Sequence, residues 1–247
     1  MAMAMDGSVP DSRPSERKFF SGMATLIILT ALAGFSRTYF LRPLLPVPTP
    51  PPLELTPLIH LHAFLLTGWV LLLFVQARLV AAMRIDLHRR LGIAGAVMAG
   101  LLVGIGILTA IQSVMRNVAP FGMEPRRFLI VPVFAIGLFA VFVVAGIRAR
   151  RDPQSHKRLM LLSTIALLPP AIARWVLLLG LGPPMVLAIA TLLVVPLVVW
   201  DVKTRRNLHP VTLWGGLLLV ISGPVRLLLA QTAGWLASAD WLVRLVR

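Results

Sequence analysis

The sequence predicts an all-α protein, a polytopic membrane bundle of about seven transmembrane helices. The chain of 247 residues is 58% hydrophobic and only 13% charged, whereas a soluble domain carries about a quarter charged residues. Its apolar residues form several continuous runs long enough for a helix to cross a bilayer. Inside a bilayer the backbone must pair within helices or closed barrels, and these runs lack the alternation of a barrel strand, so we expect helices.

The net charge of +15 would suggest nucleic acid as the partner of a soluble protein. Here the Lys and Arg residues lie in short segments beside apolar runs, where they set topology and meet anionic headgroups. The lipid bilayer is therefore the expected partner, and nucleic acid is not. Because the chain has no cysteine, disulfides, thiolate metal sites and cysteine nucleophiles are excluded.

Three regions are expected along the chain. Residues 1–18 are polar and predict a disordered cytoplasmic tail, residues 19–232 form the seven-helix domain, and residues 233–247 predict an amphipathic tail at the membrane interface. The expected helices are 19–40, 57–83, 91–114, 128–147, 159–181, 184–200 and 211–230.

Proline residues and one small-residue pattern add details to the predicted helices. A proline-rich stretch over 43–57 predicts an extended connector at the membrane surface, and Pro169-Pro170 should break the fifth helix. Ala31-Leu-Ala33 has the small-residue pattern of a signal-peptidase site, but the long leading region containing acids argues against cleavage.

The distribution of Lys and Arg predicts the orientation. Fourteen of the 24 fall on the side of the N-terminal tail and of the 2–3, 4–5 and 6–7 loops, seven fall on the other side, and three fall within spans. The positive-inside rule then places the N-terminus in the cytoplasm and the C-terminus outside, in a bacterial inner (plasma) membrane.

The second expected helix carries polar groups on two faces. His62, Trp69 and Gln76 are seven residues apart and form one stripe, whereas His60 and Arg78 lie on the opposite side. We therefore expect this helix to be central, with Gln76 bonded to another helix or to a ligand and Arg78 extending to headgroups. His60 and His62 have no accompanying carboxylates, so no metal-ion site is expected.

Two further histidines are expected at the cytoplasmic mouth. His88 lies one turn before a stripe of small residues, Gly92, Ala96, Gly100 and Gly104, which predicts either a packing seam or a groove for a planar cofactor with His88 as axial ligand. His156 opens the fifth helix in a segment, D-P-Q-S-H-K-R-L, that resembles D-L-H-R-R-L around His88, and the preceding acid can fix a histidine tautomer or cap a helix.

Two arginines are expected in the outer half of the membrane. Arg174 lies one turn beyond Pro169-Pro170, and Arg226 lies late in the seventh helix. No intramembrane carboxylate is expected, so their partners should be a ligand's acid, a lipid phosphate, backbone carbonyls or water.

The stretches H-L-H-A-F-L-L-T-G-W-V-L-L-L-F-V-Q-A-R-L-V, L-H-R-R-L-G and S-H-K-R-L-M-L-L resemble a family of uncharacterised bacterial multi-pass membrane proteins. More loosely, they are similar to transmembrane b-type cytochromes of the ferric-reductase class, in which histidines on four consecutive helices ligate two haems. The resemblance covers about 100 residues and implies haem b at His88 and His156, with His62 as a further ligand. Because His62 is expected on the opposite side of the membrane, one haem fits this chain better than two.

Three functions remain open. The first is haem binding and transmembrane electron transfer with a redox partner, and the second is transport or binding of a small anion or lipid through Arg174, Arg226 and Gln76. The third is an accessory membrane protein without catalysis. No nucleotide loop, serine-hydrolase elbow or zinc-protease motif is present, so the sequence leaves open whether the protein is an enzyme.

Overall fold

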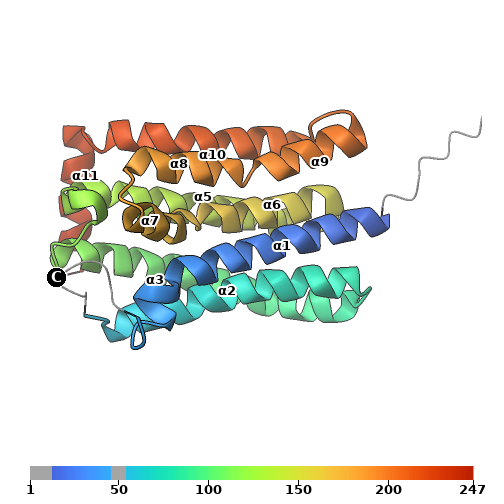
Figure 1. The fold of residues 1–247 in the computed structure, drawn as a ribbon, viewed down its shortest axis with the longest axis horizontal. Coiled ribbons are helices and arrows are strands. Elements are labelled where there is room, and N and C mark those ends of the chain that lie inside the picture. The colour runs from blue at the N-terminus through green and yellow to red at the C-terminus, as the bar shows by residue number, and fades with distance from the viewer. Residues whose placement is uncertain (1–12, 46–53, 247) are drawn as a thin grey trace, which may run out of the picture.

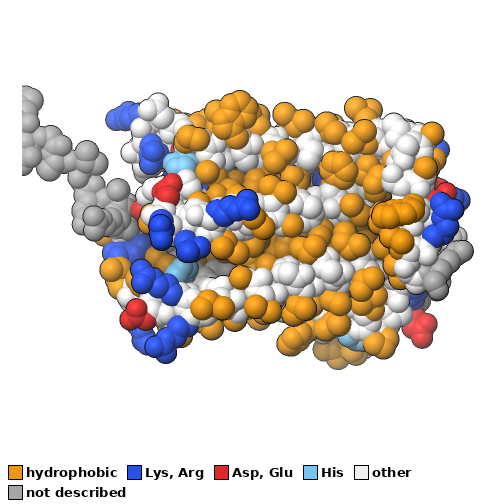
Figure 2. Space-filling model, turned by 180° about the vertical axis from the view of Figure 1, so that it is seen from behind, with side chains coloured by type: hydrophobic (Ala, Val, Ile, Leu, Met, Phe, Trp, Pro, Cys, Tyr) orange, Lys and Arg blue, Asp and Glu red, His pale blue; other side chains and the backbone are white. Residues whose placement is uncertain are grey.

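The computed structural model describes residues 13–45 and 54–246, and every regular element within these ranges is helical. The long helices run side by side along one axis of the molecule (Figure 1). Six helices are long and apolar enough to cross a membrane, or seven if one bent pair counts as a single span. The predicted all-α bundle is confirmed. Their apolar side chains cover much of the outer surface between the two ends (Figure 2), as expected for a face in contact with lipid.

The elements follow the predicted order with some extra breaks. The N-terminal half contains α1 (Arg13–Phe35) with a π-helical turn (Ser36–Phe40), α2 (Pro57–Ala81), α3 (Ile85–Met115), α4 (Pro125–Phe128) and α5 (Ile130–Arg148). The C-terminal half contains α6 (Pro153–Ala166), α7 (Pro169–Leu178), α8 (Pro183–Leu192), α9 (Val195–Arg205), α10 (Pro210–Leu229) and α11 (Ala233–Arg244).

Three helices begin six residues earlier than expected. α3 begins at Ile85 and α6 begins at Pro153. The early start of α6 has two causes: Asp152 caps the helix by accepting a hydrogen bond from the Gln154 amide (3.0 Å), and proline is well suited to the first helical position. α1 begins at Arg13, so part of the segment expected to be disordered is helical, while residues 1–12 and most of the proline-rich connector (46–53) lie outside the described residues.

The central helix is α5, not α2 as the sequence predicted. α5 packs against α3, α6 and α10, whereas α2 packs mainly between α1 and α3 at the edge of the bundle (Figure 1). One face of α2 is buried at Leu65, Trp69 and Val70, and the other leaves Phe64 exposed. Of the two polar faces of α2, only the stripe of His62, Trp69 and Gln76 is turned inward, whereas His60 and Arg78 are exposed, which an edge position allows.

Polar and aromatic contacts join α2 to the centre. The Trp69 indole nitrogen donates a hydrogen bond to the Thr164 hydroxyl (3.0 Å), a buried contact between α2 and α6. The same indole packs edge-on against Phe139 of α5 with ring centres 4.9 Å apart. These contacts fix the depth of α2 relative to α5 and α6.

The closest approach of two backbones is between α1 and α7. A Cβ atom added to Gly34 would lie 2.5 Å from the carbonyl oxygen of Ala171 and 2.7 Å from its Cα. Only glycine allows contact this close.

One span is broken near the middle of the bundle, and a second is interrupted without a sharp bend. The predicted break at Pro169-Pro170 is present: α6 and α7 meet at a bend of 40°. A second break, which the sequence did not predict, separates α8 from α9 at Leu193 and Val194, immediately before Pro196.

The last helix, α11, lies across one end of the bundle (Figure 1). Its Ala239 is fully buried in a small apolar cluster with Ala110 and Leu129, and the Trp235 indole nitrogen donates to the Arg126 carbonyl (2.9 Å). The C-terminal segment is helical as expected, and it packs onto protein as well as facing outward. At the other end, which we call the basic end, lie the start of α1 and the α2–α3, α5–α6 and α9–α10 turns, and arginine and lysine side chains gather there (Figure 2).

Candidate functional site

His88 and His156 lie together at the basic end. Each is the fourth residue of its helix, His88 in α3 and His156 in α6, and both helices begin at this end. Their imidazole rings are perpendicular, with centres 6.2 Å apart. The structure therefore brings together the two histidines that the repeated sequence motif pairs.

The hydrogen bonds around this pair leave specific nitrogen and oxygen atoms without partners. The Nδ1 atom of His156 lies 2.8 Å from the Gly146 carbonyl oxygen, which can only accept, so Nδ1 carries the proton and Nε2 presents a lone pair. Nδ1 of His88 is buried and has no hydrogen-bond partner among the described residues, and the same holds for Oε1 of Gln76. Gln76 adjoins His88, because its Nε2 donates to the His88 carbonyl (3.1 Å).

Beyond Gly92, the stripe of small residues after His88 faces outward and forms no packing seam with another described helix. Ala96, Gly100 and Gly104 are exposed, and a Cβ atom at Gly100 or Gly104 would meet nothing within 4 Å. A spacing of four residues drifts by about 40° per step around a helix, so the stripe that starts near His88 turns outward. The face of α3 that packs includes Gly95, Ala99 and Gly106.

His62 lies away from this pair, nearer the opposite end. It is half-buried, and its Nδ1 has no hydrogen-bond partner among the described residues. His60 is exposed, and its Nδ1 lies 3.0 Å from the Tyr39 hydroxyl, so the two neighbouring histidines have separate surroundings.

Arg174 is held by protein groups. Its Nε donates to the Thr38 hydroxyl (2.8 Å), one Nη donates to the Pro170 carbonyl (2.6 Å), and the guanidinium lies 4.0 Å from the centre of the Phe35 ring. Arg174 therefore connects α7 to the end of α1, which accounts for its presence without a ligand.

Arg226 has a different environment. It is 6% exposed, and its side-chain hydrogen bond is a long one, 3.5 Å from Nη1 to the Val131 carbonyl. It lines a cavity beside the break between α6 and α7.

A buried ion pair, which the sequence did not predict, lies near the basic end. Arg158 of α6 and Asp201 of α9 are both fully buried and joined by a salt bridge. Asp201 also accepts hydrogen bonds from the Thr212 hydroxyl (2.5 Å) and the His209 amide (3.1 Å) of the α10 start. The expectation that no carboxylate lies within the bundle is therefore wrong. The sequence did contain a signal for this carboxylate: Asp201 follows the apolar run of α9 directly and lies on the same helix.

A second ion pair extends this cluster to α1. Lys157 forms a salt bridge with Glu16, and Gln154 donates to the same carboxylate (2.9 Å) while its own amide oxygen accepts from Arg158 (2.7 Å). Together the two ion pairs connect α1, α6, α9 and α10. Because every group has a charged or polar partner, the cluster has the character of a structural clamp.

His209 should make stability depend on pH. Burial lowers its pKa below the usual 6.5, and the charges of Arg158 and Arg205 lower it further, while Asp201 and Asp152 oppose them. Its Nδ1 accepts the Val211 amide (3.2 Å) and caps α10, which requires neutral imidazole. The unfolded chain therefore binds more protons than the folded one below pH 6.5.

We accordingly expect the thermal midpoint of the detergent-purified protein to fall as the pH is lowered from 7.5 through 6.5 to 5.5. In His209→Asn, which keeps a capping side chain but does not titrate, the fall should be smaller. Equal pH dependence of the two proteins would exclude His209 as its source.

Comparison with known protein families, with curated proteins and with solved structures finds no match to this chain.

Proposed function

We propose that the protein binds haem b through His88 and His156 and carries electrons within the membrane. The observation that supports this most directly is the pair itself: two imidazoles from separate helices with ring centres 6.2 Å apart. In an imidazole–metal–imidazole unit the ring centres lie about 6 Å apart, since each metal–nitrogen bond is about 2.0 Å and each nitrogen lies roughly 1 Å from its ring centre.

The chemistry of the donor atoms also fits. A histidine that ligates a metal usually donates its other N–H to a carbonyl or carboxylate, which fixes the ring and its tautomer, and His156 does this with Gly146. The unpartnered Nδ1 of His88 is a nitrogen whose burial a metal would compensate. When bound, haem supplies one-electron chemistry at potentials set by its axial ligands.

The surrounding residues would then have defined roles. Gln76 holds the backbone of His88 and so positions the ring one turn into α3. The basic end supplies arginines that suit the acidic side chains of a haem. His62 lies too far from the pair in the fold to share its metal, and with no second histidine beside it, it supports one haem and not two.

The loose resemblance to b-type cytochromes supports the same proposal. We further propose that the basic end faces the bacterial cytoplasm, because the excess of Lys and Arg lies there. A redox partner would then act from the cytoplasmic side, where the histidine pair is closest to the surface.

The proposal predicts a Soret band and an oxidised-minus-reduced difference spectrum in protein purified from haem-replete cells. His88→Ala and His156→Ala should each abolish or shift the band, because each removes one of the two imidazoles that would hold the haem. His60→Ala is the matched control and should leave the spectrum unchanged, since that imidazole is exposed and bonded to Tyr39.

Protein without a Soret band would overturn the assignment of haem. Metal analysis of the same sample then separates two outcomes. If the wild-type protein contains a stoichiometric transition metal and His88→Ala does not, the histidine pair is a non-haem metal centre. No metal and no pigment would leave the binding of a small anion or lipid and an accessory role in the membrane as the remaining functions.

A further inference from the structure

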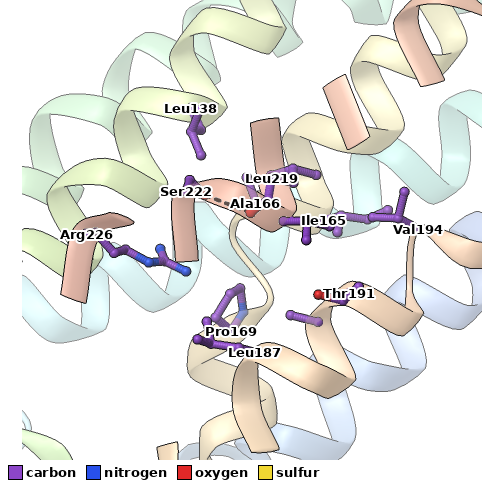
Figure 3. Close-up of a pocket in the computed structure, with 12 residues that line it drawn as sticks. Leu138, Ile165, Ala166, Pro169, Leu187, Thr191, Val194, Leu219, Ser222 and Arg226 are labelled. Carbon is purple, nitrogen blue, oxygen red and sulfur yellow. Dashed lines mark hydrogen bonds between the residues drawn. The ribbon is translucent and has the colours of Figure 1, made fainter. Parts of the chain in front are cut away.

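The two helix breaks face a common cavity. Ile165, Ala166 and Pro169 line it from the break between α6 and α7, and Ala190, Thr191 and Val194 line it from the break between α8 and α9. The α10 helix closes it with Leu219, Ser222 and Arg226 (Figure 3). Broken helices that meet within a membrane bundle are where transport proteins place binding sites, because the interrupted backbone can face a cavity.

Arg226 supplies the charge at this cavity. Its side chain extends from α10 toward the Pro169 break (Figure 3), and 94% of it is shielded, since it is 6% exposed. Its hydrogen bond to the Val131 carbonyl is long, at 3.5 Å, and none of the ion pairs found among the described residues includes Arg226. A buried guanidinium without a carboxylate is costly unless an anion or water meets it.

The two other polar residues of the cavity are hydroxyl residues. Ser222, one turn before Arg226, bonds to the Leu219 carbonyl (2.8 Å), and Thr191 lies across the cavity on α8. No acidic residue lines the cavity. The lining therefore combines one cation with the Thr191 hydroxyl as a neutral donor and with apolar walls.

The volume limits the occupant. The cavity measures ≈ 30 Å³, and roughly 10–15 Å³ are needed to hold one water molecule. The enclosed space has room for about two water molecules or for one monatomic anion.

We propose that this cavity binds a monatomic anion of the halide class, with Arg226 as its counter-charge and chloride as the abundant physiological occupant. The site is independent of the histidine pair, which lies at the basic end. It gives the bundle a chloride-binding function irrespective of whether haem is bound.

Chloride-35 NMR of the purified protein in a neutral detergent tests the proposal. Bound chloride relaxes rapidly, so the linewidth should exceed that of protein-free micelles, and added bromide should compete and reduce it. Arg226→Met should abolish the excess linewidth. Arg244→Met, which removes an equal charge from the exposed α11 surface, should leave the excess unchanged.

A cavity-filling variant keeps the test decisive if Arg226→Met fails to fold. Thr191→Leu leaves Arg226 in place but fills the space, and it should also lose the excess linewidth. If the wild-type protein gives the same linewidth as empty micelles, the cavity holds water only. If a folded Arg226→Met or Thr191→Leu protein keeps the full broadening, the chloride is bound elsewhere. Either result overturns the proposal.

Discussion

Asp201→Asn is expected to destabilise the protein by about 3–5 kcal/mol, because removing one partner of a buried ion pair leaves the other charge uncompensated. Arg158 is fully buried, and its other side-chain hydrogen bonds go to Gln154 alone. The substitution also weakens the acceptor that holds the Thr212 hydroxyl and the His209 amide. The α6, α9 and α10 helices should therefore separate first at the basic end.

Unfolding in a denaturing detergent, followed by circular dichroism, measures this effect. Asp240→Asn is the matched control: it removes an acid from an exposed salt bridge with Arg126 and should change stability little. The double variant Arg158→Met/Asp201→Leu should regain much of the loss, since neither charge then needs compensation. A single variant as stable as wild type would contradict the role of the pair as a clamp.

Gly34→Ala is expected to cost about 1–3 kcal/mol, as overpacking does where the neighbour cannot move. The added methyl group would lie 2.5 Å from the Ala171 carbonyl oxygen, a backbone atom that shifts only if α7 moves away from α1. Because Arg174 joins the same two segments through Thr38, displacement of α7 would also strain that contact.

Gly22→Ala provides the comparison on the same helix. A Cβ atom at Gly22 meets nothing within 4 Å, so this change should be neutral or slightly stabilising, as alanine favours helix. The same detergent-unfolding measurement applies to both variants. Equal stability of the two would mean that α1 and α7 do not pack as closely as described.

The sequence was sufficient for the fold class and for the order of the spans, because continuous apolar runs have few structural alternatives in a membrane. It was less reliable at helix ends. The starts of α3 and α6 contain His, Arg and Lys, which reads as loop composition, yet the caps and first turns of helices at a membrane surface are polar for physical reasons. His88 and His156 consequently lie on helices and not in the loops before them.

Packing was predicted less well than topology. Polar residues on two faces of α2 predicted a central position, but His60 and Arg78 are exposed, and only the other polar face is covered by protein. The glycine stripe after His88 was predicted to be a seam or groove, but the face of α3 that packs within the bundle contains Gly95, Ala99, Leu102 and Gly106.

The candidate site was partly predictable. The related motifs around His88 and His156 indicated a shared position, and the two rings do lie together. The partner of Arg158 was not predictable from a helix-by-helix analysis, because Asp201 is 43 residues away and lies close to Lys203 and Arg205, which the sequence predicted to be in a loop. Only the tertiary arrangement brings this acid under α6.

The broken span has a consequence for biogenesis. α6 and α7 have 14 and 10 residues, so neither is long enough to cross a hydrocarbon core of about 30 Å by itself. α6 also carries a cation that Asp201 of α9 neutralises. If the helices inserted one at a time, α6 would hold an unmatched charge until α9 had been synthesised. We therefore expect α6, α7 and α9 to become stable in the bilayer together.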